Sequence, residues 1–194
     1  MTITVEPLTG DALTQALPDL AQLRMTVFRA FPYLYDGDME YEERYLASYR
    51  DNPRAVLVAA RDGDRIVGAS TGMPLVDHAD AASLAHPDLP PAETIYYCAE
   101  SVLLADYRGR GIGHLFFDIR EAEARRMGFE YALFCGVVRP DDHPERPVDH
   151  RPLEGVWAKR GYQKLPGVTA TFHWTDIGSD METPHSLQAW MRRL

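Results

Sequence analysis

Hydrophobic spacing changes twice along the middle of the chain. Residues 94–105 form a long apolar run, which predicts a strand. Apolar residues then recur at helical spacing and predict a helix that ends near Gly128, with a buried stripe at Ile112, Leu115, Phe116 and Ile119. Residues 131–138 predict another strand. A strand, a helix and a strand in this order predict a crossover and a locally parallel pair of strands.

The segments before this unit predict two helices and a hairpin. Residues 2–5 predict a short strand, and Asp11 is a suitable cap for a helix that continues to about residue 30. Residues 41–49 predict a second helix. Two strands are expected at residues 55–60 and 65–71, joined by the turn sequence Asp62-Gly63-Asp64. Because a hairpin is antiparallel, the chain predicts a mixed α/β sheet.

The remaining segments predict shorter elements. Residues 77–93 contain several prolines and predict an irregular excursion, and residues 153–160 predict a short helix closed by Gly161. Residues 168–174 alternate as in a half-buried strand. From Ser186 onward, the large apolar residues share one helical face, which predicts a helical extension at about residues 181–194. Such a face would cover an apolar patch on its own chain or on a second subunit.

Length and composition favour a single domain. The chain has 194 residues, 45% of them hydrophobic, and its sequence contains no apolar stretch of membrane-spanning length. The first residues lack a basic start and an apolar core, so we expect no signal peptide and a cytoplasmic location. Cys98 and Cys135 both fall in predicted strands and are expected to be reduced core thiols.

The charge of the chain is negative and unevenly placed. A formal net charge of −9 argues against a nucleic-acid partner, because such proteins need excess positive charge. Five acidic residues lie close together, at Asp36, Asp38, Glu40, Glu42 and Glu43. This run is interpreted either as a solvated face or as an acidic mouth that attracts a cationic amine.

A basic, glycine-rich turn lies between the apolar run and the predicted helix. Its sequence is Arg108-Gly109-Arg110-Gly111-Ile112-Gly113. Glycines let main-chain amides approach a ligand closely, and a helix N-terminus favours an anion, so a diphosphate is the expected ligand. The dinucleotide-binding pattern G-x-G-x-x-G, counted from Gly109, requires a glycine where His114 stands. The chain also lacks the Gly-Lys-Ser/Thr sequence that ends a Walker loop. The alternative is a strand-to-helix turn that binds nothing.

Counted from Arg108, the turn fits the pattern Q/R-x-x-G-x-G/A and resembles the signature of the GNAT acetyltransferase superfamily. A second match lies in the sequence VWAKRGY at residues 156–162. The resemblance implies one GNAT-like domain over residues 1–194, with a mixed, mostly antiparallel central sheet flanked by helices. In such a sheet, a parallel strand pair splays apart to admit acetyl-coenzyme A (acetyl-CoA).

The resemblance also implies the residues that bind acetyl-CoA. Main-chain groups of Val102, Leu103 and Leu104 would pair with pantetheine, as in an added strand. The diphosphate would be bound by main-chain amides from Gly109 to His114, namely those of Gly109, Arg110, Gly111, Ile112, Gly113 and His114, with positive charge from Arg108 and Arg110. Trp157 stands where many relatives have the tyrosine that protonates the departing thiolate, and it is expected to contact the pantetheine arm or to lie in the core. No metal is expected.

Glu100 is the candidate general base, because it is a carboxylate within an apolar strand. It is expected to act through a water, and the alternative is a salt bridge or a capping role. Tyr162, His143 and His150 are weaker candidates for the acid that Trp157 cannot supply. Two segments are expected to shape the acceptor pocket: the proline-rich residues 139–152 and the aromatic turn at residues 31–35.

These expectations combine into an acetyltransferase that moves acetyl from acetyl-CoA to a primary amine by direct attack in a ternary complex. The amine would belong to a small molecule or a protein, with no nucleic-acid or membrane partner and with a homodimer left open. One alternative is a non-catalytic acyl-CoA sensing or interaction module. Another is an NAD-linked reductase. The sequence does not select the acceptor.

Overall fold

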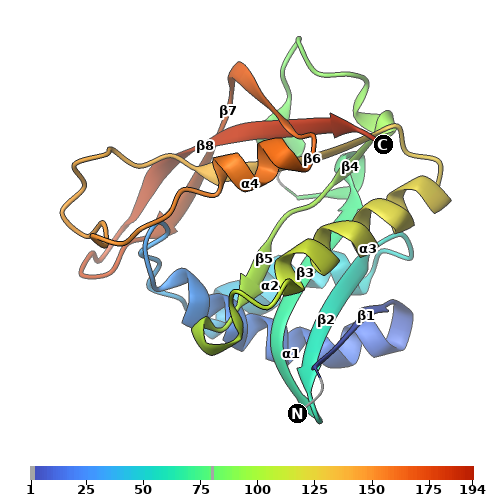
Figure 1. Ribbon diagram of the computed structural model, residues 1–194, viewed down its shortest axis with the longest axis horizontal. Helices are drawn as coiled ribbons and strands as arrows, with labels where there is room; N and C mark the ends of the chain where they lie inside the picture. Colours follow the sequence, from blue (N-terminus) through green and yellow to red (C-terminus); the bar gives the residue numbers. More distant parts are fainter. Residues whose placement is uncertain (1–2, 80) are drawn as a thin grey trace.

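The computed structural model describes residues 3–79 and 81–194 and is built on an eight-stranded sheet (Figure 1). The strand order is β1-β2-β3-β4-β6-β8-β7, and β5 also pairs with β3. The strands are β1 (Ile3–Leu8), β2 (Val56–Asp62), β3 (Arg65–Pro74), β4 (Ile95–Tyr97), β5 (Ser101–Leu103), β6 (Tyr131–Val137), β7 (Gln163–Thr175) and β8 (Glu182–Arg193). The helices are α1 (Gly10–Phe28), α2 (Met39–Arg50), α3 (Ile112–Arg126) and α4 (Glu154–Lys159).

The sheet is antiparallel except for one parallel pair, β4 with β6, which α3 connects. Helices cover both faces. Residues of α1 and α2 join one buried apolar cluster, and residues of α3 join the other. Figure 1 shows α3 in front of β2 and β3, with α1 and α2 behind them. The predicted mixed α/β architecture with a parallel crossover is therefore confirmed.

The predicted strand over residues 94–105 is not continuous. It is interrupted between β4 and β5, where residues 98–100 form no regular ladder. Met73 pairs with Tyr97, whereas Ser70 pairs with Ser101, so two residues of β3 lie opposite three residues of the interrupted strand. One extra residue of this kind makes a β-bulge, which redirects side chains at the point where it occurs.

The predicted C-terminal helix is wrong, because this segment forms strand β8 between β6 and β7. Leu187 and Ala189 are buried in the cluster on the α1 side, and Trp190 is buried in the cluster on the α3 side. A strand covered on both faces carries apolar residues on both, and such a run cannot be distinguished from a helix by periodicity alone.

Smaller differences concern element ends. Thr9, in extended conformation, is the N-cap residue of α1, so Asp11 belongs to the first helical turn and does not cap it. The first strand runs to Leu8, and Thr2 lies outside the described residues. Three short 3-10 helices lie among the described residues of the segment 75–94, and the other described residues there are irregular, as predicted. Within the described residues, the structure has no helix long and apolar enough to cross a bilayer.

A buried histidine, His78, makes stability dependent on pH. Its Nε2 atom lies 3.1 Å from the Tyr49 hydroxyl and 3.4 Å from the Tyr45 hydroxyl. Burial lowers the pKa of His78 from 6.5 to about 4, although the nearby charge of Glu100 opposes this shift. The unfolded chain therefore takes up a proton near pH 6.5 that the folded chain accepts only near pH 4.

We expect His78 to remove about 2 to 3 kcal/mol from the free energy of unfolding between pH 7.5 and pH 4.5. Urea unfolding of the wild type and of His78→Gln at both values measures this contribution. Because the glutamine does not titrate, the variant should lose less stability on acidification than the wild type. Equal losses would show that this histidine does not carry the effect.

Candidate functional site

A gap in the sheet opens where β5 and β6 diverge. β4 pairs with β6 as far as Tyr97 and Leu133, and the Cys98 amide still donates to the Leu133 carbonyl at 2.8 Å. Beyond that point β5 follows β3, whereas β6 continues along β8 as far as Val137. Figure 1 shows the two strands running apart. The predicted splay of the parallel pair is thus present between β5 and the last residues of β6.

The main chain of β5 presents different residues to this gap than expected. The Thr71 amide donates to the Glu100 carbonyl at 3.1 Å, and the Leu104 amide donates to the Val67 carbonyl at 3.0 Å. Since hydrogen-bonding sides alternate along an antiparallel strand, Glu100, Val102 and Leu104 direct their main-chain groups toward β3. Of the three residues expected to pair with pantetheine, only Leu103 directs its main chain into the gap.

The bulge between β4 and β5 is held by Arg120, a buried residue of α3. Its Nη1 donates to the carbonyls of Thr71 at 3.1 Å and Glu100 at 2.9 Å, and its Nη2 donates to Ser101 Oγ at 3.0 Å. These bonds satisfy carbonyls near the point where the ladder is interrupted. The bulge is therefore fixed from the α3 side, while the Glu100 side chain lies on the α1 side.

Glu100 is buried and accepts hydrogen bonds from three neighbours. Its Oε2 accepts from Arg24 Nη1 at 2.5 Å and from the Tyr45 hydroxyl at 3.2 Å, and its Oε1 accepts from Thr71 Oγ1 at 2.5 Å. The side chain is 3% exposed. Glu100 thus takes part in a salt bridge with Arg24. A carboxylate offers about four acceptor positions, so about one remains for a water or an amine.

Arg24 is a residue beside Glu100 that the sequence analysis missed. It donates through Nε to Glu42 at 2.5 Å as well as to Glu100, so it lies between two carboxylates. Its guanidinium also lies 4.3 Å from the Tyr45 ring centroid. Burial lowers the pKa of Arg24, but the charges of Glu100, Tyr45 and Glu42 raise it well above its ordinary value. The available signal was position: Arg24 stands four residues after Leu20 on the buried face of α1.

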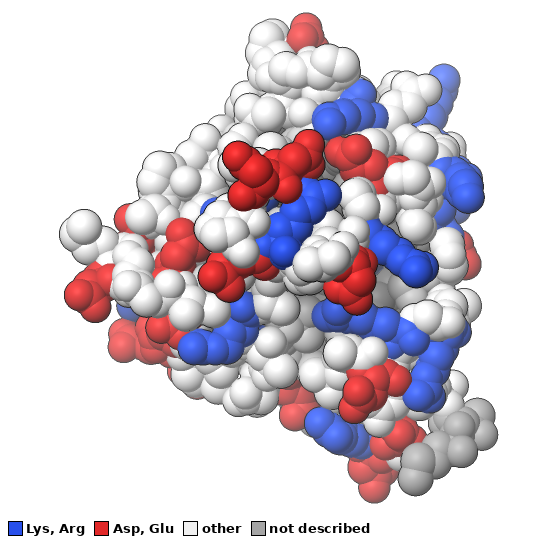
Figure 2. Space-filling view, turned by 60° about the vertical axis from the view of Figure 1, so that its left-hand side comes forward, with Lys and Arg blue, Asp and Glu red and all other residues white. Residues whose placement is uncertain are grey.

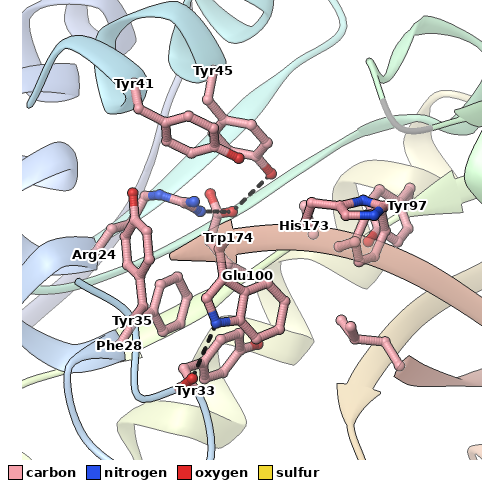
Figure 3. A pocket seen from close by; sticks show the side chains of 13 residues that line it. Arg24, Phe28, Tyr33, Tyr35, Tyr41, Tyr45, Tyr97, Glu100, His173 and Trp174 are labelled. Carbon is pink, nitrogen blue, oxygen red and sulfur yellow. Dashed lines mark hydrogen bonds and ion pairs between the residues drawn. The ribbon is translucent and has the colours of Figure 1, made fainter. Parts of the chain in front are cut away.

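A cavity of about 130 Å³ opens beside Glu100 on the α1 side of the sheet. Figure 3 shows Tyr41 and Tyr45 on one side of the Glu100 carboxylate, and Tyr33 and Trp174 on the other. Eight of its lining residues are phenylalanine, tyrosine or tryptophan. The cavity lies directly beside the bulge, so its contents would meet whatever passes through the gap.

The aromatic turn at residues 31–35 contributes Tyr33 and Tyr35 to the cavity. Phe31 instead contacts the proline-rich segment, with ring centroids 5.7 Å from His143 and 4.8 Å from His150. These histidines therefore pack against an aromatic ring and do not line the cavity. The structure shows no cluster of three or more potential metal ligands among residues 3–79 and 81–194.

The glycine-rich turn has the geometry of an anion site. Gly109 and Gly111 have positive φ angles of 74° and 80°, which other residues rarely adopt. Among the described residues, none accepts a hydrogen bond from the amides of residues 109–113, whereas the His114 amide donates to the Gly111 carbonyl at 3.0 Å. Five amides, rather than the expected six, are thus available to an anion at the start of α3.

Gly113 has no conformational or packing reason to be glycine. Its φ is not positive, and a Cβ atom added there would meet nothing within 4 Å. A glycine in the first turn of a helix is unfavourable compared with alanine. The main chain at Gly113 is therefore open to close approach by an external group. The flanking Arg108 and Arg110 side chains donate to the carbonyls of Leu103 at 3.2 Å and Asp106 at 2.9 Å, and remain exposed.

Trp157 of α4 packs over the last part of β6. Its ring centroid lies 4.9 Å from Phe134 and 5.2 Å from Trp190, and a Cβ atom at Gly136 would lie 2.9 Å from its ring. Tyr162, a weaker candidate for the acid, is buried and donates to Glu121 Oε1 at 3.1 Å, away from the cavity. Neither residue places an acidic proton beside Glu100.

Comparison with known proteins was made on sequence and on structure. Residues 17–163 match the acetyltransferase (GNAT) family. No curated protein matches the chain significantly.

Solved structures match the whole chain. The ribosomal-protein-alanine N-acetyltransferase of Brucella melitensis is 14% identical, with a TM-score of 0.61 and coverage of 98% of this chain and 99% of that one. An N-acetyltransferase of Staphylococcus aureus Mu50 is 10% identical, with a TM-score of 0.62 and coverage of 100% and 99%. The yncA protein of Salmonella typhimurium, solved with acetyl-CoA as its cofactor, is 10% identical, with a TM-score of 0.61 and coverage of 100% and 95%. At these identities the likeness shows the fold.

Proposed function

The chain belongs to the acetyltransferase (GNAT) family and uses acetyl-CoA, and on that premise we propose that it acetylates a primary amine by direct attack in a ternary complex. The observation that carries this proposal is the path through the sheet. The gap between β5 and β6 has five available amides near one end and the cavity beside Glu100 at the other.

The turn and the gap fit the two parts of acetyl-CoA. Amides of residues 109–113 would bind the diphosphate, helped by the partial positive charge at the start of α3. The main chain of Leu103 would pair with an amide of the pantetheine arm, in the manner of an added strand. Trp157, beside Gly136 on β6, would contact the same arm. This arrangement aims the thioester at the cavity.

Glu100 would act as the general base. The ammonium of the acceptor must lose a proton before its nitrogen can attack the thioester carbonyl, and Glu100 would take that proton through a water. Three donors hold the carboxylate in one orientation and leave about one acceptor position unused. Attack forms the C–N bond, the attacking nitrogen loses its second proton to solvent, and the C–S bond breaks to release the thiolate of CoA.

No general acid is required in this scheme. A coenzyme thiol, like that of cysteine, has a pKa of about 8.5, so the thiolate is a tolerable leaving group near neutral pH. Trp157 carries no proton that ionises usefully, and its indole N–H can only donate a hydrogen bond.

The location and domain organisation are part of the same proposal. Cys98 and Cys135 are both buried thiols, which suits a reducing compartment such as the cytoplasm. The family match extends over most of the chain, which supports a single domain over residues 1–194.

Calorimetric titration with acetyl-CoA, followed by an assay of free thiol with a panel of amines, tests the proposed function. We expect saturable binding of acetyl-CoA and thiol release that depends on the amine. Binding without release for any amine would favour the non-catalytic acyl-CoA module. Binding of a nicotinamide dinucleotide instead of acetyl-CoA would contradict the assignment.

A further inference from the structure

Most of the residues that line the cavity beside Glu100 are aromatic. Tyr41 and Tyr45 come from α2, Tyr33 comes from the turn after α1, and Phe172 and Trp174 come from β7. Aromatic faces attract both apolar groups and an ammonium placed near the ring. A ligand that fills this space therefore meets several aromatic rings, and five tyrosines and His173 are also among the lining residues.

The charged residues at the cavity can neutralise about one positive charge on a ligand. Among the described residues that line it, Arg24 and Glu100 carry the formal charges. Arg24 lies between Glu100 and Glu42, so the group has a formal charge of at most −1. Burial raises the pKa of Glu42, against the opposing effect of Arg24. A second ammonium inside the cavity would be repelled by Arg24 without a carboxylate to receive it.

The acidic run outside the cavity does not supply the missing charge. Asp36 pairs with Arg29 at 2.5 Å, Glu40 pairs with Arg44 at 3.1 Å, and Asp38 accepts from the Glu40 amide at the start of α2. Figure 2 shows acidic and basic side chains interspersed over this side of the molecule. Three of the five acidic residues of the run, Asp36, Glu40 and Glu42, are thus paired with an arginine, which leaves less negative charge for a polycation than the sequence alone indicates.

The cavity is small and its walls are held in place. Its volume of about 130 Å³ is close to the roughly 150 Å³ that admits one benzene ring. The Tyr33 carbonyl accepts from Trp174 Nε1 at 3.1 Å and from Arg139 Nη2 at 2.8 Å, and Arg139 also donates to the Pro32 carbonyl at 2.7 Å. The turn after α1 is thus tied to the ends of β6 and β7, so the aromatic walls are formed before a ligand arrives.

We propose that the acceptor is a monoamine that carries its single ammonium on one compact apolar group, such as an arylalkylamine. The apolar group occupies the aromatic cavity, and the ammonium lies against Glu100, where the thioester arrives. This inference rests on the proposed function and narrows its substrate class. It excludes polyamines and aminoglycosides, whose several ammonium groups need several carboxylates.

A competition among amines tests the inference. The probes are 2-phenylethylamine, spermidine, kanamycin and a short peptide with a free N-terminus, each assayed by thiol release from acetyl-CoA. We expect kcat/KM for 2-phenylethylamine to exceed that of every other probe by at least tenfold. The same four probes are titrated calorimetrically into the protein with and without CoA, so that binding is measured independently of turnover.

Phe172→Leu removes one aromatic wall and keeps an apolar side chain of similar size. We expect it to raise KM for 2-phenylethylamine by about 3- to 10-fold and to leave the affinity for acetyl-CoA unchanged. Tyr131→Leu is the matched control, because Tyr131 is a partly buried aromatic residue at the far end of β6, outside the cavity. It should leave both quantities unchanged.

The outcomes separate this inference from the function on which it rests. Failure to bind acetyl-CoA overturns the proposed function, whatever the amines do. Binding of acetyl-CoA with preference for spermidine, kanamycin or the peptide overturns the monoamine alone. Absence of saturable monoamine binding to the CoA complex also overturns it.

Discussion

Glu100→Gln lowers kcat for acetyl transfer by about 10²- to 10⁴-fold, the range that a positioned general base contributes. Glutamine keeps the length and one oxygen acceptor of the side chain, so Arg24 and Tyr45 retain a partner. What it loses is the ability to accept a proton from the acceptor ammonium. Steady-state thiol release at saturating amine measures kcat, and calorimetry checks that the affinity for acetyl-CoA is unchanged.

Glu42→Gln is the control for the structural part of this effect. Glu42 makes the same ion pair with Arg24, at the same 2.5 Å, but does not line the cavity. Each substitution removes one carboxylate from Arg24, and we expect each to lower the free energy of unfolding by about 1 to 3 kcal/mol. Only Glu100→Gln should lower kcat by the factor given above. Equal loss of kcat in both variants would assign Glu100 to the fold and exclude it as the base.

The crossover unit could be predicted from the sequence because each part has its own local signal. The apolar run, the glycine-rich turn and the helical spacing after Ile112 specify a strand, a strand-to-helix turn and an amphipathic helix in order, although Leu115 of the predicted buried stripe is exposed. Their connection then requires parallel neighbours, which β4 and β6 provide. β5 and β6 diverge because they pair with different strands, β5 with β3 and β6 with β8.

Strand β8 could not be predicted in the same way, since its two faces are covered by different layers. The spacing of Leu187, Trp190 and Met191 fits a helix as well as a strand buried on both sides. The long antiparallel partner β7 decides between them, and that contact is not local in the sequence. A segment of this kind takes its structure from its neighbours.

The site shows the same division between local and non-local information. Glu100 is recognisable as a carboxylate in an apolar run, but its three donors come from α1, α2 and β3. The bulge that separates its side chain from its carbonyl depends on Arg120 in α3. Local patterns thus indicated Glu100 as a candidate, whereas its ion pair and the aromatic cavity beside it arise from contacts across the fold.

Gly113→Leu separates cofactor binding from folding, and it should reduce the affinity for acetyl-CoA by at least about 100-fold, which is about 2.7 kcal/mol. The new side chain meets no protein atom within 4 Å of its Cβ and has an ordinary φ, and leucine favours a helix more than glycine. The protein should therefore be no less stable. The same side chain extends over the amides of residues 109–113, where the diphosphate would lie.

Gly155→Leu is the matched control, because Gly155 also lies in a first helical turn with nothing within 4 Å of an added Cβ. Gly111→Val is a weaker test, since the positive φ of Gly111 strains any β-branched residue even without a ligand. Calorimetric titration with acetyl-CoA, together with thermal unfolding of both leucine variants, completes the experiment. If Gly113→Leu binds acetyl-CoA as the wild type does, the turn does not hold the diphosphate. The proposed placement of acetyl-CoA, from this turn through the gap to Glu100, is then wrong.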